Sequence, residues 1–191
     1  MRTLRTLALA LAATAVLNGC LLPEKFTASA VVAPDASIQY QYKGTAVHAT
    51  ALLQKHQGKK ISAADDRALA ELGEKSSTKG DSLKYVGDGR YEVQTSSRIL
   101  PGPPKATMQV FNYGHSGNTY TIKSMTIKPK DLAAFKESGF APDGTFEVTL
   151  PANAKVVSNN ADSTPWFFRK SYKWNIKSLE KPASLVFTLN P

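Results

Sequence analysis

The stretch FTASAVVAPDASIQYQYK, residues 26–43, decides the fold, because it has the pattern of two strands joined by a tight turn. Every second residue is apolar in residues 26–32, and residues 38–42 repeat that alternation. Between them, Pro34 pre-sets a turn dihedral and Asp35 can bond back to the backbone. The pattern predicts an antiparallel hairpin with one apolar and one polar face.

Downstream of the hairpin, blocks of strands alternate with short helical stretches. The same reasoning predicts strands at 82–86, 90–95, 106–113, 119–127, 146–150, 155–158, 172–176 and 185–189, and helices at 46–57, 62–75 and 131–138. This order predicts an α+β fold with a mostly antiparallel sheet and two or three helices packed on one face.

Two helix ends carry specific signals. Ser62 stands three residues before Asp65, which is a variant of the capping box. Gly139 follows the third helical stretch, and Phe135 and Phe140 fall where a Schellman stop brings two apolar side chains together.

The N-terminus has the pattern of an export signal. Arg2 and Arg5 precede an uncharged run over residues 7–17, which is too short to span a membrane. Gly19 and Cys20 follow, and at this point the chain is similar to bacterial lipoprotein precursors. The resemblance implies a diacylglyceryl thioether on Cys20, cleavage before it and further acylation of the new amine, with palmitate as a typical chain.

The signal divides the chain into three parts. We expect a signal peptide at 1–19, a short tether at 20–25 and a single domain at 26–191. Extended chain covers about 3.3–3.6 Å per residue, so the tether reaches roughly 20 Å. The residue after Cys20 is not the aspartate that often retains lipoproteins in the inner membrane, which favours the outer membrane, facing the periplasm.

Composition narrows the class of partner. The chain holds 24 Lys and Arg against 15 Asp and Glu, a formal charge of +9, and a single cysteine. A lone cysteine leaves no internal disulfide. A basic domain at a bilayer is drawn to anionic headgroups. An exported, tethered protein does not meet nucleic acid, and we expect none as a partner.

The sequence gives no catalytic set, cofactor motif or metal site. His48, His56 and His115 have no neighbouring ligands, whereas a zinc site needs about three or four that converge. The run 114–118 lacks the last glycine of a nucleophile elbow and precedes a strand, so it is interpreted as a hairpin loop.

One segment is a candidate contact site. Trp166, Phe167 and Phe168 are followed directly by Arg169 and Lys170. Aromatic rings beside basic groups suit a bilayer interface or the mouth of a ligand site. The alternative is a loop whose aromatic rings fold back onto the core.

The C-terminal half also carries a family resemblance. Residues 144–151 (GTFEVTLP), then Ser158-Asn159-Asn160 and the Trp174 strand, are similar to the corresponding part of LppM-domain lipoproteins. The resemblance implies an envelope lipoprotein with an LppM-like α+β domain that binds lipid headgroups.

These observations predict a non-enzymatic lipoprotein of the cell envelope, anchored through Cys20. Its domain is expected to bind lipid, such as anionic headgroups, or an envelope protein near the membrane. Two alternatives stay open: an envelope hydrolase whose site the sequence does not reveal, and a passive structural component of an envelope assembly.

Overall fold

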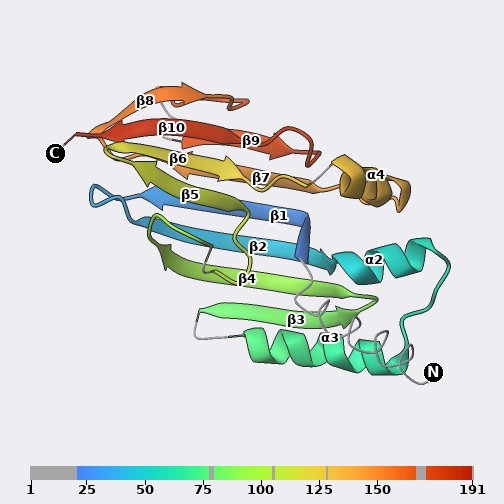
Figure 1. Cartoon of the computed structure of the whole chain (residues 1–191). Coiled ribbons are helices and arrows are strands. Elements are labelled where there is room, and N and C mark those ends of the chain that lie inside the picture. Colours follow the sequence, from blue (N-terminus) through green and yellow to red (C-terminus); the bar gives the residue numbers. More distant parts are fainter. Residues whose placement is uncertain (1–20, 78–79, 105, 128, 167–170, 191) are drawn as a thin grey trace, which may run out of the picture.

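The computed structural model describes residues 21–77, 80–104, 106–127, 129–166 and 171–190, whose strands form two sheets (Figure 1). The six-stranded sheet has the order β3 (Asp81–Gly87), β4 (Arg90–Ile99), β2 (Ile38–His48), β1 (Leu21–Val32), β7 (Asp143–Thr149) and β9 (Ser171–Ile176). The four-stranded sheet has the order β5 (Phe111–Ser116), β6 (Thr119–Ser124), β10 (Ser184–Leu189) and β8 (Ala154–Asn159).

The pairing is antiparallel throughout these sheets except between β1 and β7, which run parallel. The described helices are α2 (Ala49–His56), α3 (Ala63–Ser76) and α4 (Pro129–Glu137). The α+β class and the mostly antiparallel pairing are thus confirmed. The strands divide between two sheets, whereas the sequence pattern described only one.

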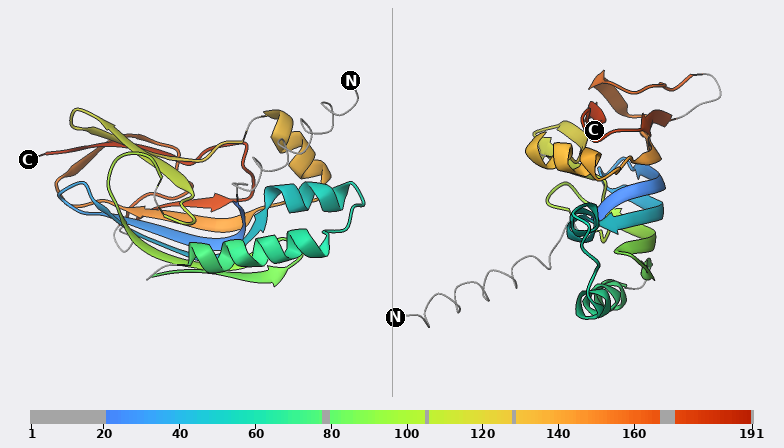
Figure 2. Two further views of the ribbon diagram at one scale, coloured as in Figure 1. Left: turned by 60° about the horizontal axis from the view of Figure 1, so that its bottom comes forward. Right: turned by 90° about the vertical axis from the view of Figure 1, so that its right-hand side faces the viewer.

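The helices occupy two places around the larger sheet. Figure 1 shows α2 and α4 at the end of the strands where β1 begins, and α3 alongside β3. Viewed along the strands, α3 and the four-stranded sheet cover opposite parts of the six-stranded sheet (Figure 2). Its inner face is therefore shared between one helix and a second sheet.

The opening hairpin forms as predicted. β1 and β2 pair antiparallel from Phe26 opposite Gly44 to Val32 opposite Ile38. Asp35 stabilises the turn, since its Oδ1 accepts hydrogen bonds from the Ser37 amide at 3.0 Å and from the Ser37 hydroxyl at 2.6 Å.

Both predicted helix ends are also confirmed. The Ser62 hydroxyl accepts the Asp65 amide at 3.1 Å. At the end of α4 the Phe140 amide donates to the Phe135 carbonyl at 3.0 Å, and Gly139 takes a φ of 75°. The two phenylalanine rings meet edge to face at 6.2 Å, the apolar contact that often accompanies a Schellman stop.

The N-terminal boundary differs from the prediction. Residues 20–25 were expected to form a tether, but β1 begins at Leu21, which pairs with His48. The same pairing explains why the helix predicted at 46–57 starts later. Residues 46–48 extend β2, so α2 begins at Ala49. Each segment becomes strand because the other supplies its backbone hydrogen-bond partners.

The second hairpin differs in length. β5 starts at Phe111 rather than at residue 106, and β6 ends at Ser124 rather than at residue 127. The expected loop at 114–118 shrinks to a two-residue turn in which Gly117 has a φ of 55°. A tight turn of this kind matches the natural twist of the two strands.

The core between the sheets is built on a contrast in side-chain size. Ala28 and Ala30 are the buried residues in the middle of β1, and both are small. Phe111 from the other sheet contacts the ring of Tyr40 on β2 and of Phe146 on β7, both at 5.3 Å. Because β2 and β7 flank β1, Phe111 lies over the space that the alanines leave.

The other part of the inner face is covered by α3. Gly73 of this helix lies so close to β3 that an added Cβ would stand 2.6 Å from the Leu83 carbonyl oxygen. The buried hydroxyl of Tyr91 on β4 donates to the Leu69 carbonyl of α3 at 2.8 Å. These contacts hold the helix directly on the sheet.

Candidate functional site

The start of β1 is irregular, and the irregularity shapes its surroundings. Pro23 pairs with Ala46 and Phe26 with Gly44, so two residues of β1 face one residue of β2. This is a β-bulge, which bends a strand and redirects its side chains. An added Cβ on Gly44 would lie 2.1 Å from the Lys25 carbonyl oxygen, so only glycine permits the bulge.

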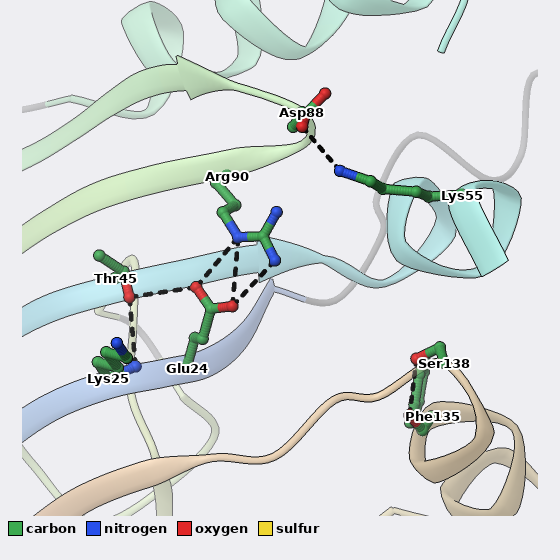
Figure 3. A network of polar contacts seen from close by, with 8 residues as sticks. All are labelled: Glu24, Lys25, Thr45, Lys55, Asp88, Arg90, Phe135 and Ser138. Atoms are coloured by element: carbon green, nitrogen blue, oxygen red, sulfur yellow. Dashed lines mark hydrogen bonds and ion pairs between the residues drawn. The ribbon is translucent and has the colours of Figure 1, made fainter. Parts of the chain in front are cut away.

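A polar network holds the bulge in place (Figure 3). Both carboxylate oxygens of Glu24 accept the Arg90 Nε–H at 3.2 Å, and its Oε1 also accepts Nη2 at 3.1 Å. Thr45 joins them by donating its hydroxyl to Glu24 at 3.4 Å and accepting the Lys25 amide at 3.2 Å. The ion pair between Glu24 and Arg90 joins β1 to β4 across β2. It holds the first residues of β1 on the sheet.

Beneath the bulge an apolar pocket of about 120 Å³ opens between the two sheets. Its floor is formed by Phe26, Val110 and Phe146, which are buried. Its rim includes Leu21 and Met125, both partly exposed, and Met125 is 38% exposed. The pocket thus offers an apolar interior and an apolar mouth.

Close packing of Phe26 makes the floor flat. Its ring stacks on Tyr42 at 5.5 Å with an interplanar angle of 13°. On the β7 side the ring lies against Gly144, where an added Cβ would stand 2.4 Å from it. A side chain at that position would push the ring into the pocket.

A second, smaller core closes this end of the molecule. Leu22 and Val47 pack with Leu52 of α2 and with Phe135 and Phe140 of α4 and its stop. The two helices therefore close the end of the strands at which β1 begins, beside the pocket.

His48 lies at this end as well, and it is unusual. Its side chain is 4% exposed, and neither ring nitrogen has a hydrogen-bond partner among the described residues. Burial lowers the pKa of His48 below its usual value, because the charged imidazolium would lose its hydration. The fold therefore disfavours the protonated imidazole.

The other two histidines take ordinary positions. His56 ends α2 and is exposed. His115 is exposed on β5, where its ring stacks on Tyr120 at 5.7 Å. Within the described residues no group of three His, Cys, Asp or Glu side chains is placed to hold a metal ion.

The described neighbours of the two contact sites expected from the sequence lie at opposite ends of the larger sheet. Cys20 and residues 167–170 lie outside the described residues, but their described neighbours are placed. Leu21 starts β1, whereas Trp166 follows Ser163, which pairs with Lys173 near the start of β9. Trp166 is 79% exposed, so it does not fold back onto the core.

The pocket was not predicted from the sequence. Its lining comes from segments far apart in the chain, such as Leu21, Val110 and Leu179. The available signal was Pro23, which stands between Leu22 and the charged pair Glu24 and Lys25, because proline within a strand marks an edge or a bulge.

Among the described residues no helix is long and apolar enough to cross a membrane. No protein-family model matches the chain, and no curated protein matches it. Among solved structures, the NMR structure of the folded domain of the Mycobacterium tuberculosis LppM protein is similar. Its TM-score is 0.40 at 13% sequence identity, over 91% of this chain and 95% of that chain.

The state of His48 predicts a pH dependence of stability. As the pH falls through about 6.5, the unfolded chain binds a proton on His48 more readily than the folded chain, whose pKa is lowered, so the free energy of unfolding falls by up to about 1.4 kcal/mol per pH unit. His48→Leu should remove this part of the slope, and His56→Gln, at an exposed site, should leave it. Urea unfolding between about pH 5 and 7.5 measures it. An unchanged slope in His48→Leu would contradict the assignment.

Proposed function

We propose that this chain is a lipid-anchored, non-enzymatic protein of the bacterial cell envelope. Acyl chains on Cys20 hold it in the outer membrane facing the periplasm, and its domain binds lipid or an envelope protein beside that membrane. The observation that carries the proposal is that Leu21, the residue directly after the cysteine, already belongs to β1 and pairs with β2.

The geometry of β1 gives the anchor a mechanical role. Consecutive Cα atoms lie about 3.8 Å apart, so Cys20 follows the central sheet without slack. The bulge network of Glu24 and Arg90 then ties the strand to β4. An anchor on Cys20 thus holds the end of the fold with α2, α4 and the pocket within a few ångströms of the lipid.

The positive net charge also favours attachment to a membrane that carries anionic lipids. Lys and Arg exceed Asp and Glu by 24 to 15. A basic residue near an anionic surface contributes about 1 kcal/mol, and two acyl chains suffice for stable anchoring. Charge and acyl chains together favour a lasting attachment.

Replacement of Cys20 tests the anchor directly. In cells fed labelled palmitate, Cys20→Ser should give an uncleaved chain that takes up no label, because the thioether cannot form. Val31→Ala, an exposed site that keeps the cysteine, is the control and should be labelled like the wild type. Gel mobility and label in the purified chain are the readouts. Label on the Cys20→Ser chain would refute the proposal.

The segment that begins at the exposed Trp166 supplies a second contact. At about 3.3 Å per residue, β1 spans roughly 33 Å from Leu21 to Val31. Val31 pairs with Thr149, and Thr149 with Ser171, so the start of β9 lies at the far end of the sheet. We propose that Trp166, with Phe167, Phe168, Arg169 and Lys170, contacts the same bilayer, with the strands lying along the membrane.

Tryptophan emission separates this arrangement from an upright one. The chain has two tryptophans, and Trp174 is buried with its Nε1–H on Asn160 at 2.9 Å. In Trp174→Phe, brominated lipids in vesicles carrying the lipidated protein should quench Trp166 strongly. In the matched Trp166→Phe chain, the buried Trp174 should stay unquenched. Equal emission with and without bromine in Trp174→Phe would show that Trp166 faces away from the lipid.

A further inference from the structure

The apolar pocket lies beside the residue that carries the proposed anchor. Leu21 and Leu22 both line it, and Leu21 is the direct neighbour of Cys20. A hydrocarbon chain attached to Cys20 therefore starts within one residue step, about 3.8 Å between Cα atoms, of the pocket lining.

The chemistry of the pocket fits hydrocarbon and not a polar group. The hydroxyl oxygens of its two serines already accept backbone amides: Ser124 from Ala183 at 2.9 Å and Ser178 from Glu180 at 3.1 Å. The floor residues Phe26, Val110 and Phe146 are apolar. A ligand headgroup would find few free polar partners there, whereas methylene groups would find close packing.

The size of the pocket limits the ligand further. Sites for whole small molecules measure about 300–1,000 Å³, whereas an apolar cavity of about 150 Å³ accepts benzene. The volume here is about 120 Å³. It therefore takes a few methylene groups of one chain and cannot enclose a complete lipid.

We propose that the pocket seats a segment of one acyl chain of the protein's own N-terminal lipid while the protein is in water. The inference rests on the proposed acylation of Cys20. A tethered chain reaches the pocket at an effective concentration in the millimolar range or above, which a free lipid does not match. In a bilayer the surrounding chains are equally apolar, so the pocket serves the protein when it is outside one.

A photoreactive fatty acid tests this on the full chain. Cells are fed palmitate that carries a diazirine, and the lipidated protein is purified, freed of excess detergent and irradiated. We expect cross-links between the acyl chain on Cys20 and peptides holding Met125, Ile127 or Leu179, which line the pocket. An equal mixture of isotope-labelled and unlabelled protein identifies the cross-links that form within one chain.

Two variants provide the comparison. Met125→Trp places a large ring at the mouth of the pocket, and the cross-link yield should fall by about ten-fold, because a filled cavity no longer admits hydrocarbon. Leu100→Trp is the matched control, since Leu100 is 55% exposed and follows the far end of β4. Its cross-links should equal those of the wild type.

The outcomes separate the two proposals. If no photoreactive chain is found on Cys20, the anchor itself is refuted, and the inference falls with it. If the chain is present but its cross-links scatter over the surface, or persist in Met125→Trp, the pocket assignment alone is wrong. A cross-linked adduct in the pocket with the mass of a phospholipid would show that a bilayer lipid, and not the protein's own acyl chain, occupies the pocket.

Discussion

The structure depends on the pairing of β1 on both of its sides. β1 is antiparallel to β2 on one side and parallel to β7 on the other. The parallel pair joins the first described strand to one that begins at Asp143, so β7 and β9 extend the larger sheet on the other side of β1. The start of this strand at Leu21 leaves no slack between the core and Cys20. The fold itself therefore fixes how far the domain lies from any lipid that is attached to Cys20.

Packing around β1 explains why a pocket forms where it does. In the middle of the strand Ala28 and Ala30 are small, and Phe111 of the second sheet fills the space above them. Toward the N-terminal end the bulge lifts the strand, and Phe26 lies flat between Tyr42 and Gly144. The pocket lies there between the two sheets, and the small core formed with α2 and α4 closes that end of the strands.

The structural features that could be predicted from the sequence are those that depend on neighbouring residues. The alternation in residues 26–43 predicted the hairpin, Ser62 predicted a helix cap, and Gly139 predicted a Schellman stop, since each depends on neighbours a few residues away. Pairing between distant segments could not be predicted in this way. The β1–β7 pair, the division into two sheets and the start at Leu21 depend on partners far along the chain.

The candidate site also combines features that neighbouring residues predict with features that depend on distant segments. Cys20 belongs to a short local pattern, and the exposure of Trp166 agrees with a segment whose three aromatics cannot share one face. That Leu21 and the start of β9 lie at opposite ends of the sheet could not be predicted from local sequence. The pocket could not either, because Phe26, Val110 and Leu179 meet only after both sheets have formed.

Amide hydrogen exchange over residues 21–25 tests the central claim most directly. Pro23 has no amide proton and residues 24–25 form the bulge, so the test depends on Leu21 and Leu22, which pair with β2. In the lipidated protein their amides should exchange much more slowly than those of an unfolded peptide. Exchange of these two amides at the rate of an unfolded peptide, beside protected residues 26–32, would contradict the claim. The segment would then be a free tether, and neither the anchor nor the pocket would be fixed relative to the other.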